Sequence, residues 1–488
     1  MELIEILNVI LMIFLGSFIG MLFGSIPGLG AALTIVLLLP ITYFMSPLSA
    51  ILLLLSAYQS AEYGGSISAL TLGIPGTPAA AATVIDGFEY AKNTSPGKAI
   101  SFSLTASTIG GICGSLILIL FSKPLTVLAL KMSAPEYFLV GTLGLFAIAT
   151  LASKNLIKSA ISAILGLLTA TVGMDLFTGA HRFTFGRVEL LEGVGMIVLI
   201  VGVFGFSEII NIISKGFANE KPATKEMLKS KISFKEFKGV SKHIGLGAIM
   251  GSLIGAFPGT GAGTASFFSY SLGRKVSKKP DTYGKGNPEG IVAPESANNA
   301  TVGSALLPLL TLGIPGSATI AIIMGAFVIH GIQPGPKVFE TNTVLVNGIL
   351  WGFLFAAIAM FIIGKILTPF FSRILIVPNK FLVPILLVVS TMGVYVNNKL
   401  FFDVWLALGL GIVAFLCKKL DYSLPSFVLA FILSPIIEEN FRRSLSMSSG
   451  SYTIFVSSFF SKILVLVILV LIIYGVKNSI QKKRKNNT

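Results

Sequence analysis

The sequence Thr71-Leu-Gly-Ile-Pro-Gly76 recurs as Thr311-Leu-Gly-Ile-Pro-Gly316, and both copies lie between long apolar stretches. Glycine weakens a helix and proline removes a backbone donor, so neither copy favours a continuous helix. At membrane depth, an interrupted backbone is stable only where protein or water surrounds it. A single break of this kind is often only a kink, but two matched breaks indicate discontinuous helices at a binding site.

A second pair of motifs occurs in the same order. Ser25-Ile-Pro-Gly-Leu-Gly30 aligns position for position with Ala256-Phe-Pro-Gly-Thr-Gly261, 231 residues later, and the first pair of motifs is 240 residues apart. Two motifs in the same order at nearly constant spacing indicate an internal duplication, with about nine residues inserted in the second copy.

The composition is that of a membrane protein. Of the 488 residues, 54% are hydrophobic and only 12% are charged, whereas a soluble domain carries about 25% charged residues. Apolar runs near or above the roughly 20 residues that span a bilayer recur along the chain, for example at 6–23, 344–366 and 454–476. We therefore predict an all-α polytopic membrane protein with two inverted structural repeats, re-entrant hairpins and discontinuous helices.

Positive charge marks the cytoplasmic face. Half of the 36 Lys and Arg residues lie in three short segments, 215–242, 274–285 and 477–488. Such clusters are typical of cytoplasmic loops. The two clusters that flank 243–273 make this stretch a hairpin entering from the cytoplasm, whereas the N-terminus lacks early Lys and Arg and fits outside, which is why we expect the repeats to be inverted.

Four regions follow from these patterns. We expect a first membrane repeat at 1–214, a basic cytoplasmic amphipathic linker at 215–242, a second membrane repeat at 243–476, and a basic cytoplasmic tail without regular structure at 477–488. Within the first repeat, membrane helices are predicted at about 100–121, 138–152, 157–177 and 190–213.

The residue inventory disfavours several function classes. The net charge of +15 is concentrated in membrane-flanking loops, so it does not indicate a nucleic-acid partner. Two cysteines and three histidines show no ligand spacing, and the apolar segments show no nucleophile paired with a base. We therefore expect no metal site and no enzyme, with an intramembrane enzyme as a remote alternative. A passive channel is disfavoured because breaks among small residues favour occlusion.

Broken helices supply the chemistry of the expected site. Half-helix N-termini present unpaired N–H groups that attract carboxylates, and C-termini present carbonyls that attract cations. The residues that we assign to substrate binding are Pro27, Gly28, Gly30, Ser66, Gly76, Thr77, Pro258, Gly259, Thr260, Gly261, Asn298, Asn299, Gly316 and Ser317. Those assigned to a coupling cation are Ser60, Gly73, Ser296 and Gly313. We interpret Glu62, Asp86 and Glu295 as loop residues at the membrane interface.

The motifs together resemble one transporter family. Besides the paired breaks, the chain contains Tyr63-Gly-Gly-Ser66, Asp86-Gly87 and Gly331-Ile-Gln-Pro-Gly-Pro336. The chain is similar over nearly its whole length to the large permease subunit of the tripartite tricarboxylate transporter family. This resemblance implies secondary import of carboxylates such as citrate, powered by a Na+ or H+ gradient, with a small membrane subunit and an extracytoplasmic solute-binding protein as partners. Only the glycine–proline motifs carry over as site residues.

We therefore expect a carboxylate importer that moves its site across the membrane by an elevator-type motion. It would bind no resident cofactor, only the coupling Na+ or H+. We expect it to lie in the inner or plasma membrane as a multi-pass protein in contact with lipids, with a cytoplasmic C-terminus and with a homodimer as one expected assembly. The alternative is a stand-alone ion-coupled symporter of another small solute.

Overall fold

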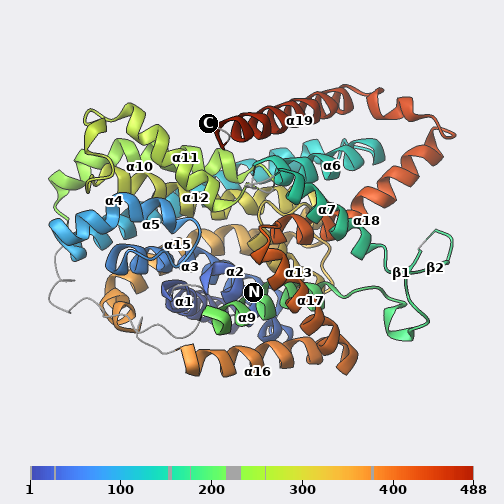
Figure 1. Ribbon diagram of the computed structural model, residues 1–488, viewed down its shortest axis with the longest axis horizontal. Coiled ribbons are helices and arrows are strands. Elements are labelled where there is room, and N and C mark those ends of the chain that lie inside the picture. Colours follow the sequence, from blue (N-terminus) through green and yellow to red (C-terminus); the bar gives the residue numbers. More distant parts are fainter. Residues whose placement is uncertain are drawn as a thin grey trace.

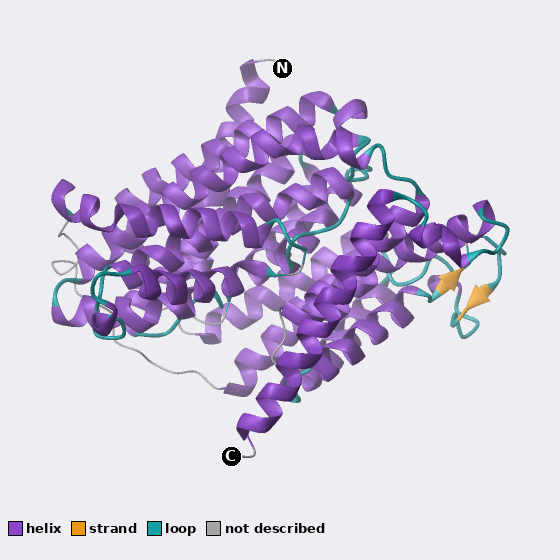
Figure 2. Cartoon of the chain, turned by 90° about the horizontal axis from the view of Figure 1, so that it is seen from above, coloured by secondary structure: helices purple, strands orange, loops and turns teal. Residues whose placement is uncertain are grey.

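The computed structural model describes residues 3–26, 29–151, 156–175, 177–215, 232–258, 260–374 and 379–486. Helices account for nearly all of the regular structure of this part of the chain, and Figure 2 shows one small strand pair at its edge. The first half contains α1 (Leu3–Ser25), α2 (Gly30–Leu38), α3 (Pro47–Leu72), α4 (Ala80–Asn93), α5 (Pro96–Ala129), α6 (Ala134–Leu151), α7 (Leu156–Ala170), β1 (Gly173–Met174), β2 (His181–Arg182), α8 (Met196–Ile200) and α9 (Ser207–Lys215). The second half contains α10 (Phe234–Gly255), α11 (Gly261–Val276), α12 (Glu289–Leu312), α13 (Ala318–Ile329), α14 (Val338–Thr341), α15 (Thr343–Ile374), α16 (Asn379–Asn398), α17 (Phe401–Lys419), α18 (Leu424–Met447) and α19 (Phe459–Asn486).

The apolar helices fit a membrane-embedded chain. Among the described residues, six helices are long and apolar enough to cross a bilayer. They are Ile4–Ser25, Pro96–Ala129, Met196–Ser214, Thr343–Leu367, Phe401–Lys419 and Leu424–Met447. The prediction of an all-α polytopic membrane protein is confirmed at this level.

Two helices form the centre of the molecule. Every residue from Ser49 to Leu70 of α3 and from Gly290 to Thr311 of α12 is buried. A helix that is buried all round must satisfy its polar side chains within the protein, because no water reaches them. Hydroxyl, amide and carboxyl groups on α3 and α12 therefore face one another and their neighbours α1, α5 and α10.

Small residues allow α1 to pack closely against α3, and α10 against α12, in the same way. A Cβ added at Gly20 of α1 would lie 2.1 Å from the carbonyl oxygen of Ala57, and one at Gly251 of α10 would lie 2.2 Å from that of Ala297. Gly20 and Gly251 are 231 positions apart, and their partners Ala57 and Ala297 are 240 apart, the same two offsets as the paired motifs. The close approach of α1 to α3 thus recurs between α10 and α12, as is typical of small-residue packing in membranes.

The predicted breaks are present. Helix α3 ends at Leu72 and α12 at Leu312, and the next residue in each case, Gly73 or Gly313, has a positive φ of 73° or 75°. This left-handed conformation ends a helix and favours glycine. Helices α1 and α2 are separate, as are α10 and α11. The re-entrant course of these pairs and the inverted sense of the repeats stay predictions.

Some expected boundaries are wrong. The helix predicted at 157–177 ends at Ala170, and the chain then forms the β1–β2 hairpin, in which Gly173 pairs with Arg182. The basic tail, expected to lack regular structure, continues α19 as far as Asn486. Most of the predicted linker, residues 216–231, lies outside the described residues; its end, from Phe234 onward, begins α10 with a Ser233 capping box.

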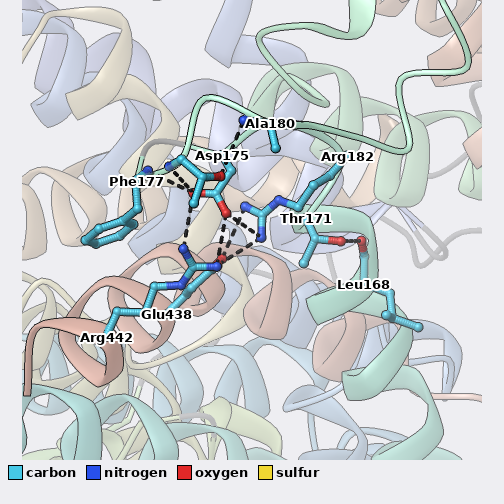
Figure 3. Close-up of polar contacts among 9 residues, drawn as sticks. Leu168, Thr171, Asp175, Phe177, Ala180, Arg182, Glu438 and Arg442 are labelled. Atoms are coloured by element: carbon cyan, nitrogen blue, oxygen red, sulfur yellow. Dashed lines mark hydrogen bonds and ion pairs between the residues drawn. The ribbon is translucent and has the colours of Figure 1, made fainter. Parts of the chain in front are cut away.

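The β1–β2 hairpin projects from the edge of the helices and is held by charges (Figures 1 and 3). Asp175 accepts hydrogen bonds from the N–H groups of Phe177 and Thr178, and its other oxygen lies 3.0 Å from Nη2 of Arg442 on α18. Arg182 and Arg442 also both contact Glu438. The Phe177 N–H and the Arg442 guanidinium hold the pKa of Asp175 at about 2, below its usual value of 3.8.

Replacing Gly251 with Ala should destabilise the protein by roughly 1–3 kcal/mol, because the new methyl group overlaps the α12 backbone. Gly245→Ala on the same helix is the matched control, since no neighbouring atom lies within 4 Å of its added Cβ. Thermal unfolding of the purified variants measures both effects. Equal unfolding midpoints for the two variants would show that α10 and α12 are not in this close contact.

Replacing Asp175 with Asn should loosen the hairpin, so that amides of 173–182 exchange hydrogen faster, as measured by mass spectrometry at neutral pH. Glu189→Gln, in the short 3-10 helix Val188–Leu190 that follows the hairpin, serves as the control. Because the folded pKa of Asp175 is depressed, its contribution in the wild type is fully present above pH 3.8 and is lost as the pH falls through about 2. Unchanged exchange in the Asp175 variant would contradict the role of this carboxylate.

Candidate functional site

Four helices begin at one cavity of about 600 Å³. Its wall includes the first residues of α2 and α11, the loop that leads into α4, and the start of α13. The two breaks of each repeat therefore meet at the same place. A Cβ on Gly30 would lie 3.5 Å from the carbonyl oxygen of Gly76, so the two motifs of the first repeat adjoin. A Cβ on Gly263 in α11 would lie 3.9 Å from Pro78, which brings the start of α11 beside the loop that leads into α4.

Glycine makes two of these helix starts possible. Gly30 and Gly261 have φ values of 64° and 68°, and each is the first residue of its helix. For other residues this conformation costs about 1 kcal/mol or more. Both helices begin at the cavity with a glycine in this conformation.

The helix starts leave backbone donors available. No side chain caps the N-terminus of α2 or α11 by a hydrogen bond. At α4 the hydroxyl of Thr77 accepts a hydrogen bond from the Ala80 N–H. At α13 the hydroxyl of Ser317 accepts a hydrogen bond from the Ile320 N–H. The first N–H groups of a helix have no partner inside the helix and carry its positive dipole end. Four such starts around one cavity suit an anionic ligand.

Other elements complete the wall. Helix α3 contributes Tyr58 and Glu62, and Tyr58 lies 3.4 Å from the Ser317 hydroxyl. The π-helical segment Val201–Phe206, between α8 and α9, contributes Phe204. The remaining wall residues with polar side chains are Thr77, Ser207, Glu208, Thr319, Lys418, Tyr422 and Ser423. Lys418 forms an ion pair with Glu208 and brings a positive charge to this side of the cavity.

The structure brings together part of the predicted substrate site. The cavity wall contains Gly30, Gly76, Thr77, Gly261 and Ser317. The N–H groups of Gly76 and Gly316 were expected to face the substrate. They donate hydrogen bonds to the carbonyls of Gly65 and Ala305, respectively, and these bonds close the two breaks.

The other predicted substrate residues have different surroundings. The Thr260 hydroxyl donates to the carbonyl of Ile254, and Pro258 is buried beside α6. Ser66 donates to Glu295, Asn299 accepts from Gln59, and the Asn298 amide lies 3.5 Å from the Glu62 carbonyl. Pro27, Gly28 and Gly259 lie outside the described residues. A direct role for any of these residues in substrate binding stays a prediction.

The four residues predicted for a cation do not line the cavity. Gly73 and Gly313 lie at the C-terminal ends of α3 and α12, and the Ser296 hydroxyl donates to the carbonyl of Ile244. The Ser60 hydroxyl is buried and has no hydrogen-bond partner among the described atoms. Their role in cation binding stays a prediction.

The interpretation of three acidic residues as interface loops is wrong. Glu62, Asp86 and Glu295 lie within helices α3, α4 and α12, and all three are buried. Asp86 accepts hydrogen bonds from the Tyr270 hydroxyl and from three backbone N–H groups of the 284–287 loop. It thereby fixes α4 to the segment before α12.

Glu295 is surrounded by hydroxyl groups. Its carboxylate accepts hydrogen bonds from Ser66 on α3, Thr83 on α4, and Ser103 and Ser107 on α5. No lysine, arginine or histidine of the described part forms an ion pair with it. We call these four residues the hydroxyl cage. Because hydrogen bonds to a buried anion replace its hydration, the cage joins four helices at their centre.

Sequence reasoning missed several wall residues. Tyr58 and Glu62 are one helical turn apart, and this spacing places them on one face of α3. That signal was present in the sequence. Phe204, Glu208 and Lys418 lie in otherwise apolar helices, and only the packing of α9 and α17 brings them to the cavity.

Apolar helices of this kind around a partly polar cavity fit a multi-pass membrane protein. Residues 10–429 match the family model of the Tripartite tricarboxylate transporter TctA family. The chain belongs to this family, and it is a transporter permease and not an enzyme. Proteins of the family work with a binding protein and a small membrane subunit.

Two proteins of Agrobacterium vitis are similar in sequence. One, described as an uncharacterized 52.8 kDa protein in the TAR-I ttuC' 3' region, is 36% identical over 471 residues, which cover 96% of this chain and 94% of the relative. The other, an uncharacterized protein in the TAR-II ttuC' 3' region, is 36% identical over 234 residues, 48% of this chain and 97% of the relative. No solved structure matches the chain.

Replacing Glu295 with Ala should lower the free energy of unfolding by about 3 kcal/mol, because the four hydroxyls of the cage lose their shared acceptor. Ser107→Ala removes one hydrogen bond and should cost only about 1 kcal/mol. Thermal unfolding of the purified protein compares the two. If the Glu295 variant unfolds at the wild-type temperature, the cage is not a structural centre.

Proposed function

We propose that this protein imports small carboxylates, either tricarboxylates such as citrate or dicarboxylates, and that a Na+ or H+ gradient drives the import. The observation that carries the proposal is the convergence of four helix N-termini on one cavity. Backbone N–H groups and hydroxyls there would bind carboxylate groups, with Ser317 and Thr77 as hydroxyl side chains on the wall from the two repeats. Membership of the tricarboxylate transporter family supports this substrate class.

We propose that transport uses two inverted repeats and an elevator-type motion. The α1–α3 contact recurs between α10 and α12 at matching offsets, and the N–H bonds that close the two breaks recur as well. These repeated contacts support an internal duplication. A body made of the broken helices would carry the cavity past the apolar helices, such as α17 and α18, that line its other side.

The proposed import requires a defined arrangement in the cell. We propose that the chain lies in the inner or plasma membrane with its C-terminus in the cytoplasm. A solute-binding protein would then deliver the carboxylate to the outer side. The basic residues in 477–485 support this orientation, because such clusters favour the cytoplasmic leaflet.

Uptake into proteoliposomes tests the substrate class. The permease, with its small subunit and binding protein, should accumulate at least one of succinate, malate and citrate when Na+ and pH gradients are applied. Ser317→Asp should reduce this uptake by about tenfold or more, because it adds a negative charge to the cavity. Ser317→Asn is the matched control, since Asn and Asp both cap helices well.

Three outcomes are informative. Failure of the wild type to accumulate any of the three acids would contradict carboxylate import. Equal uptake by the Asp and Asn variants would show that substrate does not pass through this cavity. Undiminished uptake without the binding protein would favour a stand-alone symporter.

A further inference from the structure

The cavity proposed for an anion contains an acidic side chain of its own. Glu62 lies on its wall together with the starts of α4 and α13. Two negative charges a few ångströms apart in a protein cavity repel each other. A carboxylate substrate and an ionised Glu62 are therefore poorly compatible in the same cavity.

The surroundings of Glu62 do not neutralise it. The residue is only 5% exposed, and its Oε2 atom has no hydrogen-bond partner among the described atoms. The side chains of Thr77 and Asn298 interact with the carboxylate. No described lysine, arginine or histidine pairs with it, and Lys418, the cationic residue on the cavity wall, pairs with Glu208.

Asn298, whose amide nitrogen lies 3.5 Å from the Glu62 backbone carbonyl, also has an unpaired oxygen in the described part of the chain. Asn298 is 1% exposed, and its Oδ1 atom has no partner among the described atoms. A buried carboxylate oxygen and a buried amide oxygen without donors are suited to a small cation, since oxygen atoms are the ligands of hard cations. Burying them without any partner is costly.

We propose that Glu62 couples the cation to the substrate: a Na+ ion or a proton neutralises its carboxylate, and only then does an anionic substrate bind in the cavity. This inference rests on the proposed carboxylate transport. In this proposal the backbone N–H groups still bind the substrate, and Glu62 does not take over that role. It determines when those donors are accessible to an anion.

The other described charged and titratable groups near Glu62 supply no net positive charge that would neutralise it. Glu295 on α12 adds negative charge, and Tyr58 lies one turn away on α3. Across the cavity, Glu208 and Lys418 compensate each other. The cation that neutralises Glu62 therefore has to come from solution.

The test measures binding of succinate, malate and citrate to the purified permease, with Na+ varied independently of pH. For the wild type, binding of the acid with the highest affinity should weaken by about a hundredfold when Na+ is removed at alkaline pH. This factor is the repulsion expected between two like charges roughly 6 Å apart at an effective dielectric constant of about 20. Glu62→Gln should bind tightly under all these conditions. Glu62→Asp keeps the charge and should keep the dependence.

Asp403→Asn is the matched control. Asp403 is a buried acid on α17 that accepts a hydrogen bond from Asn398 and does not line the cavity. This variant should retain the wild-type cation dependence. Persistence of that dependence in Glu62→Gln would overturn the proposal while leaving carboxylate transport intact. If none of the acids binds to the wild type under any condition, the transport proposal itself fails.

A measurement on the wild-type protein separates the two cations and does not need a variant. A carbodiimide reacts with protonated buried carboxyls, and mass spectrometry locates the modified residue. If Na+ is the coupling ion, adding Na+ at constant pH should protect Glu62 from labelling. If the proton is the coupling ion, labelling of Glu62 should depend on pH and not on Na+. Labelling that responds to neither would contradict the proposal.

Discussion

The structure depends on one constraint: the backbone N–H groups at the starts of four helices need hydrogen-bond partners. A helix that begins inside a membrane protein leaves several N–H groups without partners, and no lipid can satisfy them. The chain meets this constraint by directing α2, α4, α11 and α13 toward one cavity, where a ligand or water can reach these groups. The breaks that create these starts are therefore also the origin of the proposed site.

The rest of the fold supports those breaks. Helices α3 and α12 lie buried at the centre, and each ends where a break begins. Glycines on α1 and α10 allow close packing against them, and the hydroxyl cage holds Glu295 between α3, α4, α5 and α12. The end of α17 and the start of α18 line another side of the cavity.

Much of this arrangement could be predicted from the sequence. Duplicated glycine–proline motifs predicted the helix ends at Gly73 and Gly313, because few conformations suit those residues. The same reasoning predicted a common site for Gly30, Gly76, Gly261 and Ser317, and these four residues line one cavity; their role in binding stays a prediction. It failed for Glu62, Asp86 and Glu295, because local sequence cannot show that a carboxylate has several donors from distant segments. Lys418 and the π-helical segment before α9 were also beyond prediction, since only tertiary packing brings them to the cavity.

The most direct measurement is a cryo-EM structure of the permease with a bound carboxylate such as citrate. Our account predicts density for the acid against the first residues of α2, α4, α11 and α13, next to Thr77 and Ser317. Density for the acid at a different place, with this cavity empty, would contradict the central claim that opposed helix starts form the transport site.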